Sequence, residues 1–139
     1  MPVAKVLAAG ALAGIIANLT GYIITGRLFH RYQLHTPATW RAGESWTHYL
    51  SAAGIRVVGC IGIALLYSAV WPSLALGSGA VSAGLIFGLI LWAVTALPLV
   101  LEAALFVNWH RGFVVGLLLD WLAVCVLASG MAAVAVRAV

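Results

Sequence analysis

Residues 81–107 read VSAGLIFGLILWAVTALPLVLEAALFV, and residues 113–136 read FVVGLLLDWLAVCVLASGMAAVAV. At a rise of about 1.5 Å per residue, about 20 apolar residues make a helix long enough to cross a bilayer. Each stretch exceeds that length and holds one charged residue, Glu102 or Asp120. Both therefore predict transmembrane helices. The short turn between them, residues 108–112, makes the two helices antiparallel neighbours.

Two further apolar stretches lie upstream, at residues 3–25 and 51–70. The whole chain of 139 residues is 65% hydrophobic and only 7% charged. Soluble domains are roughly 45–50% apolar and about 25% charged, so lipid is the solvent that suits this composition. The sequence predicts an all-α membrane protein, one four-transmembrane-helix bundle that occupies residues 1–139 as a single domain.

Helix packing in the bundle is indicated by glycines and one proline. Gly10 and Gly14 are four residues apart, as are Gly84 and Gly88. Such pairs place two glycines on one helix face, where helices in lipid approach closely, and packing within the bundle is favoured over dimerisation. Pro98 lacks a backbone donor and should kink the third helix near the carbonyl of Val94.

The first loop, residues 26–50, is the only long one. Thr36 and Pro37 form a typical helix start, because proline suits the first helical position. Aromatic and charged residues then alternate in the manner of an interfacial amphipathic segment at headgroup level: Trp40, Arg41, Glu44, Trp46, His48 and Tyr49.

Basic residues set the expected orientation, since cytoplasmic loops are rich in Lys and Arg. Loops one and three lie on one side of the membrane, and the termini and the second loop, residues 71–80, on the other. The first side holds Arg27, Arg31, Arg41 and Arg111, and the second holds Lys5 and Arg137. We expect a multi-pass protein of the cell membrane with loops one and three cytoplasmic and both termini outside.

Each predicted helix carries one strongly polar residue at a similar expected depth: Asn18, Arg56, Glu102 and Asp120. A charge near the membrane centre costs at least ~2.5 kcal/mol, so these groups should face one another. We expect Arg56 to bridge Glu102 or Asp120, with Asn18 completing the hydrogen bonds. Two carboxylates and one guanidinium leave a surplus negative charge for a proton, a cation or a basic ligand to neutralise.

His110, in the turn between the two carboxylate-bearing helices, is a further candidate member of this polar cluster. The cluster has two interpretations. It is either a structural cluster, in which the polar groups pair with one another and fix the helix register, or a cytoplasm-facing cavity that binds a small ligand, a proton or a metal. The residues alone leave both open.

Other chemistry is weakly indicated. Glu44 and His48 are four residues apart, a spacing that suits metal ligands on one helix face, whereas His30 and His35 are five apart and would not align. No cofactor is identified. A net charge of +4 without a clustered basic stripe argues against nucleic-acid binding. Cys60 and Cys125 lie in apolar runs and are interpreted as small buried residues.

The second half of the chain resembles a known group. The run GLIFGLILWAVTALPLVLEAALFVNWHRGFVVGLLLDWLAVCVLASGM, residues 84–131, is similar to the DUF1761 family of small bacterial four-helix membrane proteins. The likeness lies in the glycine-rich start, Leu91-Trp92, Pro98, Leu105-Phe106, the short turn and Gly130, with Gly21-Tyr22 and Leu28-Phe29 in the first helix. The resemblance implies the four-helix topology and assigns no activity or site residue.

Three functions from different classes remain. The first is a non-enzymatic membrane protein that binds a small ligand or serves as an accessory subunit of a larger complex. The second is an oligomeric ion or small-solute pathway. The third is a membrane-embedded enzyme on a lipophilic substrate, with Glu102 or Asp120 as general base and His110 as acid. The expected partners are the lipid bilayer and a homo-oligomer or larger membrane complex.

Overall fold

The computed structural model describes residues 3–36, 38, 45–73 and 79–137. Four segments are long and apolar enough to cross a membrane, and they span Val3–Leu28, Trp46–Ser73, Ala80–Phe106 and Arg111–Val136. The predicted all-α four-helix bundle is confirmed, and the chain has the architecture of a small multi-pass membrane protein. Its helical elements are α1 (Val3–Ile23), η1 (Ile24–Leu28), α2 (His30–Gln33), α3 (Trp46–Val70), η3 (Trp71–Ser73), α4 (Ala80–Val94), α5 (Ala96–Phe106) and α6 (Arg111–Arg137).

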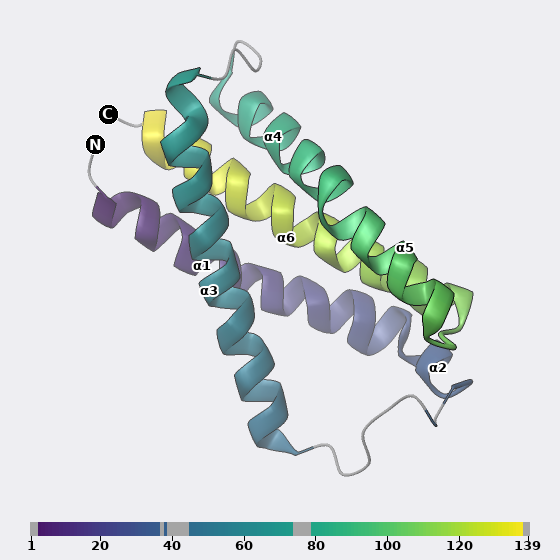
Figure 1. Cartoon of the computed structure of the whole chain (residues 1–139). Helices are drawn as coiled ribbons and strands as arrows, with labels where there is room; N and C mark the ends of the chain where they lie inside the picture. Colours follow the sequence, from purple (N-terminus) through teal and green to yellow (C-terminus); the bar gives the residue numbers. More distant parts are fainter. Residues whose placement is uncertain (1–2, 37, 39–44, 74–78, 138–139) are drawn as a thin grey trace.

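Helix α6 is the centre of the bundle, because it packs against α1, α3 and α4. Figure 1 shows α3 crossing α1, while α4 and α5 run alongside α6 and diverge from the first half of α3. Both termini lie at one end of the bundle and α2 lies at the other. The buried core consists mostly of small side chains, which allow the helices to approach closely: Ala13, Ala17, Cys60, Ala64, Ala83, Cys125, Ala128, Ala132 and Ala133.

The two glycine pairs lie at helix crossings inside the bundle, as the packing interpretation predicts. A Cβ atom on Gly14 would lie 2.6 Å from the Cα atom of Val57 on α3, and Gly10 is equally close to the same helix. A Cβ atom on Gly84 would lie 2.7 Å from the backbone of α6, and one on Gly88 would lie 2.8 Å from it. No side chain larger than hydrogen fits at these four positions without moving a backbone.

The third membrane segment is broken where the proline requires it. Helix α4 ends at Val94, and α5 begins at Ala96. Because Pro98 has no N–H group to donate to the carbonyl of Val94, the helical ladder loses a bond there. Thr95, at the break, donates its hydroxyl to the carbonyl of Leu91 at 2.6 Å. The helix is therefore interrupted at the place where the sequence predicts the effect of Pro98.

Two helix limits that bear on the site differ from the sequence prediction. The first segment continues past Thr25 as the π-helical turn η1, closed by the bond from Phe29 N to Ile24 O at 2.9 Å. Helix α3 begins at Trp46, five residues before the predicted start at residue 51. His48 explains the early start, because its Nδ1 accepts the N–H of the N-cap residue Ser45 at 3.2 Å.

Only part of the predicted interfacial segment lies within the described residues. Trp46 and Tyr49 belong to the first turns of α3 and not to a separate helix. Trp40, Arg41 and Glu44 lie outside the described residues. The described part of loop one contains η1 and the short helix α2, and both pack against α6.

Two glycines of α6 form the surface on which η1 and α2 rest. A Cβ atom on Gly116 would lie 2.5 Å from the ring of Phe29, and one on Gly112 would lie 2.6 Å from the ring of Tyr32. Tyr32 also stacks on His110, with ring centroids 4.7 Å apart and planes 5° from parallel. Aromatic rings seated on glycines thus join the first loop to the third.

Candidate ligand-binding site

The centre of the bundle contains one ion pair. Arg56 on α3 donates from Nη1 to Asp120 Oδ1 at 2.7 Å and from Nη2 to Asp120 Oδ2 at 2.6 Å. This bidentate geometry is the strongest form of an arginine–carboxylate pair. The side chain of Asp120 is 3% exposed and that of Arg56 is 25% exposed. The acid is sealed inside the protein, whereas a quarter of the arginine side chain stays exposed.

Helix α1 completes the environment of this pair. Arg56 Nη1 donates a third hydrogen bond to the carbonyl of Ala17 at 3.0 Å. Gly21, one turn further along α1, leaves the space that the guanidinium occupies. A Cβ atom there would overlap Arg56 Nη1 and lie 2.9 Å from Asp120 Oδ1. Three helices therefore meet at Arg56 and Asp120.

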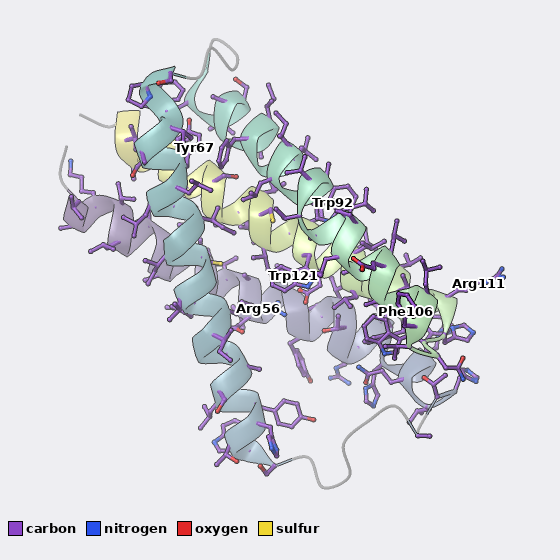
Figure 2. All side chains as sticks on the ribbon, viewed as in Figure 1. Arg56, Tyr67, Trp92, Phe106, Arg111 and Trp121 are labelled. Carbon is purple, nitrogen blue, oxygen red and sulfur yellow. The ribbon has the colours of Figure 1, made fainter. Side chains whose placement is uncertain are left out.

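The ion pair lies deeper than the sequence predicted. Arg56 is ten residues, or about 15 Å of helix, from the start of α3 at Trp46. Asp120 is nine residues, or about 14 Å of helix, from the start of α6 at Arg111. The hydrocarbon core of a bilayer is about 30 Å thick, so both side chains are near its middle. Figure 2 places Arg56 midway along α3, where this helix crosses α1.

Asn18 lies beside the pair but bonds elsewhere. Its Nδ2 donates to the carbonyl of Gly14 at 3.0 Å and to that of Ala53 on α3 at 3.2 Å. The predicted hydrogen bond to Arg56 does not form, because the amide group ties α1 to α3 one turn away. Asn18 and Arg56 nevertheless line the same cavity.

Glu102 is not part of this cluster, which corrects the prediction that four polar residues share one slab of membrane. It lies four residues, or about 6 Å of helix, from the end of α5 at Phe106. Its side chain is exposed on the outside of the bundle. Of the two predicted bridges from Arg56, only the one to Asp120 is present, so the pair is formally neutral and the predicted surplus negative charge is absent from it.

His110 is also separate from the ion pair. Its Nδ1 accepts the backbone N–H of Gly112 at 3.0 Å, and its ring stacks on Tyr32 and His35. About 14 Å of helix separates Asp120 from the first residue of α6, which follows His110. The structure does not bring together the general base and acid that an enzyme using Asp120 and His110 would need.

The metal candidates are not assembled among the described residues. His48 uses its Nδ1 at the N-cap of α3, and its predicted partner Glu44 lies outside the described residues. His35 stacks on His110 at a centroid distance of 5.0 Å, a face-to-face arrangement that directs no ring nitrogen at a shared ion. Among the residues that the structure describes, no group of three His, Cys, Asp or Glu side chains is placed to hold a metal ion.

A cavity leads from the loop-one end of the bundle to Arg56. We call it the Arg56 cavity; it has two adjoining chambers of about 410 and 590 Å³ between α1–η1 and α3, and both are open to the outside, because Tyr22, Trp46 and Tyr49 are each more than half exposed. The inner chamber reaches Arg56 and Asn18, and the outer one reaches His30 and Gln33. Both chambers share five lining residues, which are mostly aromatic or small: Tyr22, Thr25, Gly26, Trp46 and Tyr49.

The inner end of this cavity offers hydrogen-bond donors. A guanidinium has five N–H donors, and Arg56 uses three of them on Asp120 and Ala17. The Nε–H group and one Nη2–H group make no hydrogen bond to any described residue. Because Asp120 already balances the positive charge, a neutral acceptor suits these donors better than an anion, which would leave net charge in a low-dielectric site.

A second cavity, the α3–α5 groove, is on the other side of α3. It has a volume of about 410 Å³ and is almost wholly apolar. Gly59 and Gly62 form its α3 wall, Leu91 and Leu99 form the opposite wall, and Trp121 belongs to α6. With no charged group in its lining, this groove has the character of a surface that lipid chains fill.

Sequence reasoning missed Gly21 and the aromatic lining of the Arg56 cavity. Gly21 falls within an apolar helix, and nothing in its sequence context signals that it faces an arginine 35 positions away. The sequence predicts an interfacial helix for Trp46 and Tyr49, because the apolar run that marks the membrane segment begins only at residue 51, whereas α3 begins at Trp46. A signal was available in Ser45 followed three residues later by His48, a capping pattern in which histidine replaces the usual Glu or Gln.

Comparison with known proteins finds no matching family model, no matching curated protein and no matching solved structure. The resemblance of residues 84–131 to the DUF1761 family therefore stays a prediction.

Proposed function

We propose that this chain is a membrane-embedded binding protein for a neutral, lipophilic molecule that carries a hydrogen-bond acceptor such as a carbonyl oxygen. The ligand occupies the Arg56 cavity with its acceptor at the guanidinium. The observation that carries the proposal is an arginine with two donors left over, neutralised by a buried aspartate, at the inner end of an aromatic-lined cavity.

The shape and chemistry of the cavity support this ligand class. Binding sites for small molecules are typically about 300–1,000 Å³, mostly apolar, with a few placed polar groups that fix orientation. The two chambers fall in that range. Tyr22, Trp46 and Tyr49 provide flat apolar surfaces for a ring or a branched chain, while Arg56 provides the orienting donor.

The ion-pathway alternative has less support from the geometry. A pathway needs polar groups spaced along its length. The charged pair at the middle of the bundle is sealed on the Asp120 side, and the other cavity near α3 is apolar. A binding cavity that ends at Arg56 accounts for the same polar residues. It needs no second opening on the far side of the ion pair, as a pathway would. We further propose that the loop-one end of the cavity faces the cytoplasm.

Photolabelling with an alkylated benzophenone tests the proposal. This probe is neutral and lipophilic, and its ketone is both the hydrogen-bond acceptor and the photoreactive group. Adducts are expected on peptides containing Tyr22 and Ala53, near the inner chamber. The double substitution Arg56→Met with Asp120→Leu removes the donors without leaving a lone buried charge, and it should abolish those adducts.

The matched control is Gly62→Leu, which fills the α3–α5 groove, where a Cβ atom meets nothing within 4 Å. This control should label like the unaltered protein. Adducts concentrated around Leu91 and Leu99, or labelling unchanged by the double substitution, would show that the probe merely follows lipid-filled surfaces and would contradict the proposal.

A further inference from the structure

Glu102 is the one charged residue in α4 and α5, and it is on the outside of the bundle. Around it the surface of α5 is apolar and strongly exposed. Leu105 is 82% exposed and Phe106 is 85% exposed. No hydrogen bond or ion pair joins Glu102 to another residue that the structure describes. The carboxylate thus lies on a face that a membrane protein would present to lipid or to another membrane helix.

Such a position is costly for a lone carboxylate. Ionisable residues within membrane-spanning segments almost always face the interior of a bundle or pair with one another. Glu102 is about 6 Å of helix inside the end of α5, and among the residues that the structure describes it pairs with no cation. A partner outside the chain would remove this cost.

A suitable cation is present at the same end of the bundle. Arg111 begins α6, directly after the turn that follows α5, and its side chain is exposed. Figure 2 shows Arg111 extended away from the bundle, beyond Phe106. No hydrogen bond or ion pair joins Arg111 to another described residue. One acid and one base are therefore unpaired at the same corner of the molecule.

We propose that the outer face of α4–α5 is the interface of a symmetric dimer, in which Glu102 of each copy pairs with Arg111 of the second copy. A two-fold axis makes every contact occur twice, so a patch with one acid and one base is complementary to itself. This inference is independent of the proposed ligand site, because neither residue lines the Arg56 cavity.

The apolar part of the patch supports a second copy as the occupant. Exposed residues follow one another at helical spacing along the outside of α4 and α5, so the stripe can lie flat against its own copy. It continues through the break at Thr95 and ends at the charged corner. Its members are Ile90, Val94, Pro98, Leu101 and Leu105.

Charge reversal in two co-expressed copies tests the dimer. Glu102→Arg alone gives a chain with two basic residues at the corner, and Arg111→Glu alone gives a chain with two acidic ones. Each variant should lose self-association by at least about tenfold, since like charges then oppose each other across the interface. When the two variants are mixed, both pairs form again across the interface, and a heterodimer should appear in native mass spectrometry.

The outcomes separate the possible partners of Glu102. An ion pair within one chain would be broken in both variants, and mixing would not restore it. Wild-type protein that is monomeric after purification in mild detergent would indicate another membrane protein as the partner. Either result overturns the proposal, as does a dimer that survives both single reversals. Lys5→Glu, at the opposite end of the bundle, is the control for charge alone and should leave the dimer intact.

Disulfide cross-linking provides a second measurement that does not depend on charge. In a background where Cys60 and Cys125 are replaced by alanine, Leu105→Cys should cross-link into dimers in the membrane. Leu12→Cys, which is 49% exposed on α1, should not. Equal cross-linking at both positions would reflect random collision and would contradict a defined α5 interface.

Discussion

Asp120 accepts two parallel hydrogen bonds from Arg56, 2.7 Å and 2.6 Å long, across the boundary between α6 and α3. The guanidinium fits there because Gly21 of α1 has no side chain to exclude it. This relationship joins three of the four membrane segments at one point. It also leaves two guanidinium donors at the inner end of a cavity, so one ion pair serves both the fold and the proposed site.

Removing only one partner of this pair should strongly destabilise the bundle. Asp120→Ala leaves the Arg56 charge unpaired inside the protein, and we expect a loss of about 3–5 kcal/mol in the free energy of unfolding. Arg56→Met combined with Asp120→Leu replaces both charges by apolar groups and should restore most of that loss. Unfolding in mixed micelles measures both. Equal destabilisation by the single and the double substitution would contradict the pairing.

Gly21→Ala should disturb the ion pair, because the added methyl group overlaps the guanidinium. Overpacking of a filled interior typically costs about 1–3 kcal/mol. Gly54→Ala on α3 is the matched control, since a Cβ atom there meets nothing within 4 Å. That control should be neutral or slightly stabilising, because alanine favours helix over glycine. If the two substitutions change the unfolding free energy alike, the close approach of Gly21 to Arg56 is wrong.

Gly116→Val should release η1 and α2 from α6. The ring of Phe29 rests where the new side chain would lie, only 2.5 Å from a Cβ atom at this position. We expect faster amide hydrogen exchange in residues 24–33 and unchanged exchange at the opposite end of α6. Leu119→Val, on an exposed position of the same helix, is the control. Unchanged exchange in residues 24–33 would mean that Phe29 does not hold this segment in place.

The orientation in the membrane can be measured with single cysteines. In a background without Cys60 and Cys125, Leu34→Cys and Ser73→Cys place exposed thiols at opposite ends of the bundle. If loop one is cytoplasmic, an impermeant maleimide added to intact cells should label only Ser73→Cys. Labelling of Leu34→Cys alone would reverse the orientation inferred from the basic residues.

Much of the fold could be predicted from the sequence, because apolar length and proline placement act locally. The four segments, the antiparallel pair around residues 108–112 and the break at Pro98 all follow from composition and backbone chemistry. The pairing of Arg56 with Asp120 was one of two alternatives. Choosing between Asp120 and Glu102 required knowing which way each helix face points.

That choice depended on helix limits and rotation, which an apolar sequence specifies poorly. In α3 the start at Trp46, and not at the predicted residue 51, places Arg56 about 15 Å of helix from the helix end. In α5 nearly every residue is apolar, so no polar stripe marked the outward face of Glu102. His110 accepts a local hydrogen bond from Gly112 and stacks on Tyr32 of the first loop. Helix depth predicts neither contact.

Native mass spectrometry of the protein extracted from its own membranes tests the central claim most directly. The account predicts a bound mass in addition to lipid on the unaltered protein and on the Gly62→Leu control. The same mass should be absent from the folded Arg56→Met, Asp120→Leu double variant. A bound mass that persists in the double variant, or an unaltered protein that carries lipid alone, would contradict the claim that Arg56 and its cavity form a ligand-binding site.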